Sequence, residues 1–215
     1  MKRMYLIGLI FSIAVVFTGS HGYAYPVNVG DLIILSDSWG STNGGEFTVT
    51  VIGSDYSFQT FCVETGEYLA FGKQFKVVGI STAAVWGGVD PGGDLLDPET
   101  AYLFSNFAAG TLADYEYTPG DGRVASADLL QRAIWYLEGE SGGVDNEYVE
   151  LANGSGWTDI GNVRVLNLEW AVDYGSYKIG DRAQDILVTV PEPGILILLG
   201  IAMSAVGLAA RRYRF

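Results

Sequence analysis

The sequence has very little histidine or cysteine, which limits the chemistry open to the folded protein. Its 215 residues include one histidine, His21, and one cysteine, Cys62. Because His21 lies in a segment that we expect to be removed, the mature chain has no imidazole for Ser-His-Asp or Cys-His catalysis and lacks the ligands of most zinc sites. A single cysteine also excludes an internal disulfide.

Motifs for phosphate or dinucleotide binding are missing as well. Carboxylates are plentiful, so an acid pair of the glycosidase type, for instance Glu138 and Glu140, stays open as a distant alternative. Three aspartates in a glycine-rich loop, Asp90, Asp94 and Asp97, fit no standard calcium loop and are better explained by a turn followed by a helix N-cap. We therefore expect no cofactor, no metal and no enzymatic activity.

Basic residues are few, and most of them are not in the body of the chain. The formal net charge is −13, from 12 basic and 25 acidic residues. Five of the basic residues lie at the chain ends, together with one acid, Glu192, so the body has 7 basic and 24 acidic residues and a net charge of −17. Such a body repels nucleic acid and anionic membrane surfaces, and it suits a soluble protein outside the cytoplasm.

The first 24 residues have the pattern of a secretory signal peptide. Lys2 and Arg3 precede an apolar run from Tyr5 to Phe17, and the segment ends in small residues up to Ala24. We expect cleavage after Ala24 or nearer Ser20. An uncleaved N-terminal anchor is the alternative.

The body, residues 25–188, is predicted to be mainly β, as a sandwich or barrel, with a small α-helical insertion. Apolar alternation and turn residues predict its strands. The predicted strands cover residues 31–35, 46–52, 56–64, 74–80, 162–168 and 183–190. In the third of these, alternation places Cys62 and Glu64 on one face of the strand, and Phe61 and Val63 on the other.

Two helices are expected in the insertion. The first has Asp97 as its N-cap and Pro98 at its first position, and it should end at Gly110. The second, capped by Ser126 and closed by Gly139 or Gly142, carries an apolar stripe at helical spacing. The stripe consists of Leu130, Ala133, Ile134 and Leu137.

Gln131 falls at the edge of that stripe, where its amide would be partly dehydrated. An unpaired buried amide costs about 1–3 kcal/mol, so we expect Gln131 to have a partner. The only cysteine, Cys62, is the candidate.

The C-terminal segment, residues 189–215, combines three features. Pro191, Glu192 and Pro193 precede an apolar run from Ile195 to Ala210, which would be about 25 Å long as a helix. The run is closed by a basic cluster that places the C-terminus on the cytoplasmic side. The cluster consists of Arg211, Arg212 and Arg214.

This arrangement resembles the PEP-CTERM sorting signal. The resemblance implies a transmembrane helix that anchors the precursor, removal of the tail by an exosortase, and a mature protein at the cell surface or outside the cell. Proteins of this class are exported by bacteria that also make exopolysaccharide. An ordinary C-terminal membrane anchor is the alternative.

The segments Phe61-Cys62-Val63 and Leu130-Gln131-Arg132-Ala133-Ile134-Trp135 resemble the thioester domains of bacterial surface adhesins. In that family a strand cysteine displaces ammonia from a helix glutamine, and the resulting thioester acylates an amine or hydroxyl of a partner. The resemblance implies a Cys62–Gln131 cross-link. The aromatic side chains that would wall its pocket are Phe61, Tyr102, Trp135 and Tyr136.

The sequence thus favours an exported surface or extracellular-matrix protein that attaches covalently through Cys62 and Gln131. The expected partners are an exosortase-type enzyme, a matrix polysaccharide or surface-protein nucleophile, and the membrane before processing. A passive structural or carbohydrate-binding component of a biofilm matrix is the alternative. In that case Cys62 is a small buried hydrophobe or pairs with a second chain.

Overall fold

The computed structural model describes residues 27–190, except for positions 38, 42–44, 86 and 88–91. The expected signal helix, the Pro-Glu-Pro motif, the transmembrane helix and the basic cluster lie outside the described residues. Within the described part of the chain, no helix is both long and apolar enough to cross a membrane.

Six strands form one antiparallel sheet in the order β3-β2-β1-β4-β7-β8. The strands are β1 (Leu32–Asp37), β2 (Phe47–Val51), β3 (Ser57–Thr60), β4 (Gln74–Ser81), β7 (Val163–Trp170) and β8 (Arg182–Thr189). Each overlaps a predicted strand. In β1 and β2 the burial has the period of two that the sequence indicates, since Ile33, Leu35 and Val49 are fully buried. The prediction of a mainly β fold is confirmed.

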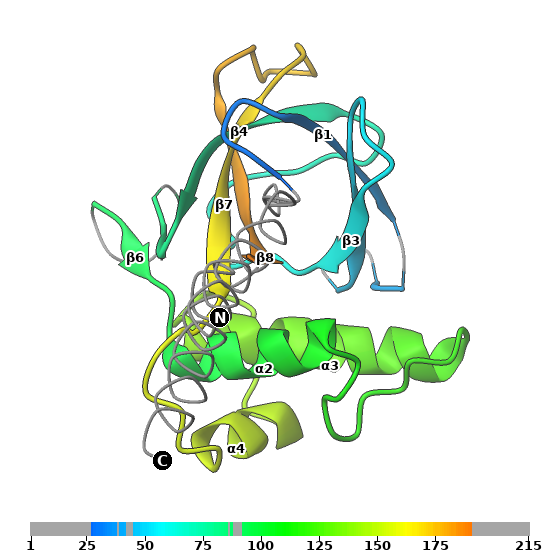
Figure 1. Ribbon diagram of the computed structural model, residues 1–215, viewed down its shortest axis with the longest axis vertical. Coiled ribbons are helices and arrows are strands. Elements are labelled where there is room, and N and C mark those ends of the chain that lie inside the picture. The colour runs from blue at the N-terminus through cyan, green and yellow to red at the C-terminus, as the bar shows by residue number, and fades with distance from the viewer. Residues whose placement is uncertain (1–26, 38, 42–44, 86, 88–91, 191–215) are drawn as a thin grey trace, which may run out of the picture. The chain divides into compact units, whose positions relative to one another are not determined.

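The two edges of this sheet are joined by the residues that follow β3. The backbone N–H of Leu187 in β8 donates to the carbonyl of Phe61 at 3.1 Å, and the N–H of Val63 donates to the carbonyl of Asp185 at 3.1 Å. Between these bonds, Cys62 faces Ile186 in an isolated bridge. The sheet therefore closes on itself as a barrel, with the helices at one end (Figure 1).

The insertion between β4 and β7 contains three helices and a two-stranded sheet. The elements are β5 (Ala83–Ala84), β6 (Asp94–Leu95), α2 (Pro98–Ala108), α3 (Asp121–Leu137) and α4 (Glu147–Asn153). Helix α2 begins at Pro98, as predicted, although the Asp97 side chain makes no capping hydrogen bond. Helix α4 was not predicted. It has only seven residues, too few to show a helical period, and its one marker is Asn146, whose side chain accepts from the Tyr148 N–H.

The predicted start of α3 at Ser126 is wrong. The helix begins at Asp121, directly after Gly120, whose φ of +144° ends the preceding turn. Ser126 lies within the helix, and its hydroxyl accepts a hydrogen bond from the Glu116 N–H at 3.1 Å. The hydroxyl therefore pairs with a backbone group of the preceding loop and not with an N–H group at the start of the helix. At the other end, Gly139 follows the C-cap residue Glu138 with a φ of +72°, in agreement with the predicted stop.

Two apolar clusters make up the core. One fills the barrel and includes Phe75, Trp170 and Cys62. The other lies between barrel and helices and includes Phe61 and Ile134. The alternation along residues 58–64 is therefore confirmed, because neighbouring side chains enter different clusters. Burial of each large apolar side chain contributes about 1.5–3 kcal/mol, so α3 is held firmly against the barrel end.

Candidate functional site

Gln131 and Cys62, which are 69 positions apart in sequence, meet through two hydrogen bonds. The Cys62 N–H donates to Oε1 of Gln131 at 3.0 Å, and Nε2 of Gln131 donates to the Cys62 carbonyl at 2.8 Å. Both residues are buried, with exposed fractions of 1% for Gln131 and 2% for Cys62. The predicted partner of Gln131 is thus the residue that carries the only thiol.

The local fold explains why Cys62 has both backbone groups available for Gln131. The carbonyl of Phe61 and the N–H of Val63 are hydrogen-bonded to β8. In an antiparallel pair, the N–H and C=O of the residue between them, Cys62, therefore point away from β8. Among the described residues, no strand pairs with Cys62 on that side, because β3 ends at Thr60. The planar amide of Gln131 takes the place of a neighbouring strand by using one N–H donor and its carbonyl acceptor.

Helix α3 fixes the position of this amide. Leu130, Ala133 and Ile134 are fully buried against the cluster between helices and barrel, while Arg132 is exposed. Gln131 is therefore directed to the seam between the two apolar clusters. Because the buried N–H and C=O of Cys62 would each cost about 1–3 kcal/mol if unpaired, the bidentate contact also stabilises the fold.

The backbone contact also affects the side-chain carbonyl of Gln131. The Cys62 N–H polarises the Gln131 carbonyl by donating to its oxygen, as donors in an oxyanion hole do. Burial raises the pKa of the Cys62 thiol well above its ordinary value, and the nearby Glu64 carboxyl adds to this shift. The thiol is therefore protonated at neutral pH.

The four predicted wall residues have different surroundings. Trp135 is 9% exposed and lies in the same cluster as Cys62, and its Nε1 has no hydrogen-bond partner in the described structure. Phe61 is fully buried and contacts Phe107 edge-on, with ring centroids 4.9 Å apart. Tyr102 packs at the margin of the helical cluster, where it contacts Trp157 edge-on. Tyr136 is 46% exposed, on the outward side of α3.

Buried carboxylates flank Cys62, and the sequence reasoning missed them. Glu64 is 1% exposed and accepts hydrogen bonds from the backbone N–H groups of Asp185, Gly66 and Glu67 at 2.6 to 3.1 Å. Asp185 is fully buried and accepts from the Asn167 side chain at 2.7 Å. The one signal was alternation, which placed Glu64 on the same face as the buried Cys62.

Burial changes the acidity of these groups. Desolvation raises the pKa of Glu64 to about 8 and that of Asp185 to about 7. Glu138, at the end of α3, behaves in the same way, because desolvation raises its pKa to about 8 and the charges of Asp97 and Asp94 add to the shift.

The acid pair considered from the sequence bonds to two separate segments. Glu138 accepts from the Asp97 N–H at 3.2 Å, while Glu140 accepts from the Thr65 hydroxyl at 2.7 Å and from the Thr65 N–H at 3.2 Å. Each carboxylate therefore holds a different segment, at Asp97 or at Thr65, against the C-terminal end of α3. Among the residues that the structure describes, no group of three or more His, Cys, Asp or Glu side chains is arranged to hold a metal ion, and Asp90 lies outside them.

Comparison with known proteins gives one match. The family model of the PEP-CTERM protein-sorting motif matches residues 189–214, which contain the Pro-Glu-Pro triad and the three arginines. No curated protein and no solved structure matches the chain. The chain therefore carries a PEP-CTERM sorting motif, which indicates an exported protein that is sorted by an exosortase.

Proposed function

We propose that this exported protein forms an internal thioester between Cys62 and Gln131 and uses it to attach covalently to a partner at the cell surface or in the extracellular matrix. One observation carries the proposal: the amide of Gln131 is held on the backbone of Cys62 by two hydrogen bonds at 2.8 and 3.0 Å. Effective concentrations in such a fixed contact are high enough to drive reactions that free thiols and amides do not undergo.

The reaction balances without a cofactor. The sulfur of Cys62 attacks the side-chain carbonyl carbon of Gln131, a sulfur–carbon bond forms, and the carbon–nitrogen bond of the amide breaks. The thiol proton leaves with the amide nitrogen as ammonia. The bond is later opened by an amine or hydroxyl of the partner, which takes the acyl group and returns the proton to the thiol.

Burial protects such a bond from hydrolysis. Water is excluded from the seam between the two apolar clusters, so hydrolysis is slow. The raised pKa of the buried Cys62 thiol also makes its thiolate a poor leaving group until the site opens. Each molecule reacts once and is not regenerated, so the protein is an attachment module and not an enzyme. Its partners are the sorting exosortase and a nucleophile on a matrix polysaccharide or a surface protein.

Methylamine provides the direct test. The amine should open the bond, add to residue 131 and expose the Cys62 thiol, and peptide mass spectrometry should locate both changes. Cys62→Ala should prevent the addition of methylamine, and Tyr136→Ala, an exposed position on the same helix, should not. Failure of methylamine to modify residue 131 in unfolding buffer as well as in native buffer would refute the thioester.

A second function is favoured by the completeness of the same contact. The N–H and the C=O of Cys62 are both satisfied by the Gln131 amide, so the pair is a structural clamp without any covalent step. In that case the protein is a passive component of the extracellular matrix. The unmodified mass of the protein, together with an unreactive Gln131, would support this function.

A further inference from the structure

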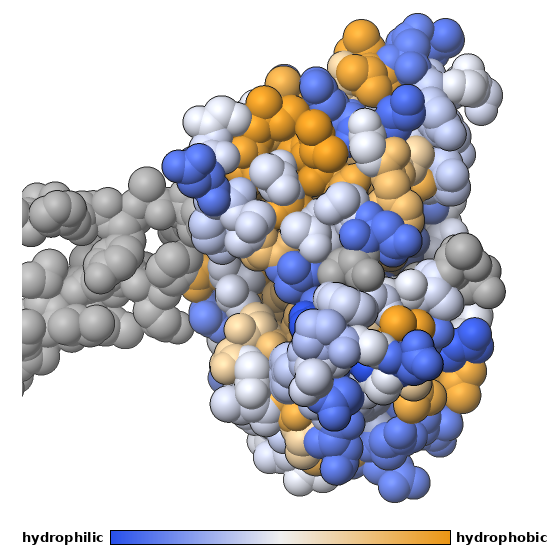
Figure 2. All heavy atoms as spheres, turned by 90° about the vertical axis from the view of Figure 1, so that its right-hand side faces the viewer, coloured by the Kyte–Doolittle hydropathy of each residue, from blue (hydrophilic) through white to orange (hydrophobic). Residues whose placement is uncertain are grey.

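A hollow of about 340 Å³ lies between strand β3 and the helical layer. Tyr56, Phe58 and Gln59 line it from the strand side, and Phe107, Tyr117 and Arg123 line it from the helical side. Figure 2 shows the molecule from the side on which β3 lies, with a recess between the barrel and the helices. The volume falls at the lower end of the range typical of small-molecule sites.

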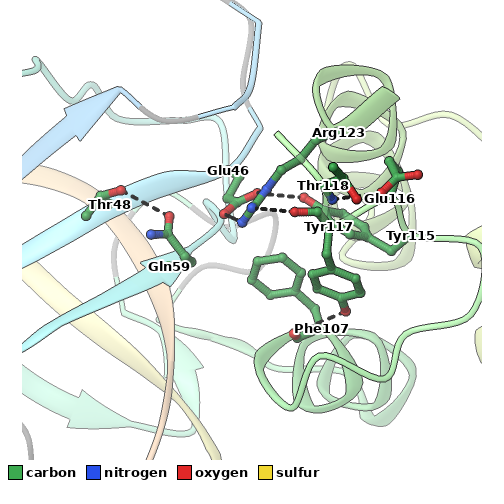
Figure 3. A network of polar contacts seen from close by, with 9 residues as sticks. All are labelled: Glu46, Thr48, Gln59, Phe107, Tyr115, Glu116, Tyr117, Thr118 and Arg123. Carbon is green, nitrogen blue, oxygen red and sulfur yellow. Dashed lines mark hydrogen bonds and ion pairs between the residues drawn. The ribbon is translucent and has the colours of Figure 1, made fainter. Parts of the chain in front are cut away.

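Aromatic rings form two walls of this hollow. On the strand side, Tyr56 and Phe58 are neighbours, with ring centroids 5.7 Å apart. On the helical side, the rings of Phe107 and Tyr117 are nearly parallel, 6.1 Å apart at an interplanar angle of 19°. The Tyr117 hydroxyl donates to the Phe107 carbonyl at 3.2 Å, which fixes this second wall (Figure 3).

The third part of the lining is Arg123, which is held in an ion pair with Glu46. Arg123 donates to both carboxylate oxygens of Glu46, at 2.9 and 2.6 Å, and to the Tyr117 carbonyl at 2.8 Å (Figure 3). Because Glu46 is fully buried, its charge cancels that of Arg123 where the two groups meet. The planar amide of Gln59 lines the same hollow.

We propose that this hollow binds one neutral sugar unit of a polysaccharide. The C–H faces of a pyranose ring stack on aromatic rings, and its hydroxyls match the planar polar edges of Gln59 and Arg123. A purely apolar ligand would bury the guanidinium against hydrocarbon. An anionic sugar would meet a cation that is already neutralised, on a chain with a net charge of −13.

This binding is separate from the proposed thioester. Phe107 contacts Phe61, which directly precedes Cys62, but Phe61 is fully buried and does not line the hollow. The hollow therefore serves non-covalent recognition, and it should function whether or not the thioester forms.

The test is binding of defined sugars to the processed protein, followed by calorimetry and saturation-transfer NMR. The probes are glucose, galactose, mannose, N-acetylglucosamine and their β-linked trimers, with glucuronate as the anionic counterpart. We expect saturable binding of at least one neutral sugar and weaker binding of glucuronate. Absence of saturable binding by every neutral probe, or a preference for glucuronate, overturns the proposal.

Two neighbouring variants locate the site. Ala108 is exposed and lines the hollow, so Ala108→Trp should fill it, whereas Ala109→Trp alters the adjacent exposed residue outside the lining. We expect Ala108→Trp to weaken binding at least about tenfold, which corresponds to the loss of one good contact. Ala109→Trp and Cys62→Ala should leave affinity within about twofold by the same scale. Gln59→Leu, which keeps the volume but loses the polar edge, should weaken binding as Ala108→Trp does. Equal affinities of the Ala108→Trp and Ala109→Trp proteins would place binding elsewhere.

Discussion

At the scale of single residues, the Cys62–Gln131 pair contributes to stability in two separable ways. As a free amide, Gln131 satisfies two buried backbone groups of Cys62. A thioester would instead close a span of 69 positions, and the departure of Nε2 would remove the donor to the Cys62 carbonyl. By analogy with a disulfide, such a closure is worth up to about 4 kcal/mol, less any strain. Cys62→Ala removes the closure and keeps the free amide, whose two hydrogen bonds to the backbone of residue 62 offset part of the loss.

We therefore predict that Cys62→Ala lowers the free energy of unfolding by about 3 kcal/mol, and that Gln131→Ala lowers it by about 2 kcal/mol more, through the unpaired N–H and C=O. The double variant should equal Gln131→Ala, since the pair acts as a unit. Urea unfolding measures all three. A Cys62→Ala protein as stable as the parent would mean that no cross-link was lost.

Buried carboxyls make stability depend on pH in a defined direction. The folded pKa of Glu138 is raised to about 8 by desolvation, above its value in the unfolded chain. The folded state therefore binds the proton more tightly, and this contribution is complete at low pH and is lost as the pH rises toward 8. Glu64 and Asp185 are shifted in the same direction.

We accordingly expect the melting temperature to fall between about pH 5 and about pH 8.5, the window that these raised pKa values set. Glu138→Gln keeps the acceptor for the Asp97 N–H and should flatten part of this dependence. Glu150→Gln, an exposed carboxyl on α4, should leave the pH profile unchanged. A profile that rises toward pH 8.5 would contradict the burial argument.

At the scale of elements, one ion pair joins α3 to the barrel. Glu46, which directly precedes β2, is fully buried and accepts from Arg123 of α3 and from the Tyr115 hydroxyl at 2.8 Å (Figure 3). Removing one member of a buried pair leaves an uncompensated charge, which costs about 3–5 kcal/mol. We predict a loss of this size for Arg123→Met in urea unfolding. Arg132→Met, on the exposed side of the same helix, should change stability by less than about 0.5 kcal/mol.

The elements that the sequence predicted are those with a local apolar pattern. Strands β1 and β2 bury every second residue, β7 and β8 contain short apolar runs that are buried on both faces, and the helices at Pro98 and Gln131 bury one face. Each of these patterns can be recognised in a short stretch of sequence. The missed features depend on tertiary contacts. Ser126 looks like a helix cap but serves the backbone of Glu116, β5 has only two residues, and the Glu46–Arg123 pair spans 77 positions with no local mark.

The candidate site was predictable in part for the same reason. Alternation placed Cys62 on a buried face, and helical period placed Gln131 at the edge of a buried stripe. That the two residues would meet was expected from the resemblance to thioester domains and not from either period. Sequence alone did not indicate that the contact runs through the Cys62 backbone, because this depends on where β3 ends and on which side β8 pairs. The buried state of Asp185 likewise follows from barrel closure and from no local pattern.

At the scale of the whole molecule, the N-terminal signal pattern and the sorting motif at residues 189–214 each predict one processing event. The mature protein should lack residues 1–24 and the segment after about Pro193, and it should be found outside the inner membrane. Replacing Pro191, Glu192 and Pro193 with alanine should retain the precursor in the membrane fraction. Terminal peptides from extracellular and membrane fractions provide the measurement, and peptides from residues 195–210 in the extracellular protein would contradict it.

The intact mass of the freshly purified, folded protein tests the central claim most directly. If Cys62 and Gln131 form a thioester, the mass must be lower than that of the processed sequence by one ammonia. Cys62→Ala and Gln131→Ala should each show the full mass of their own sequence, because neither can release the amide nitrogen. A parent protein at full sequence mass, with a thiol that alkylates completely once the chain is unfolded, would contradict covalent attachment and leave the hydrogen-bonded clamp.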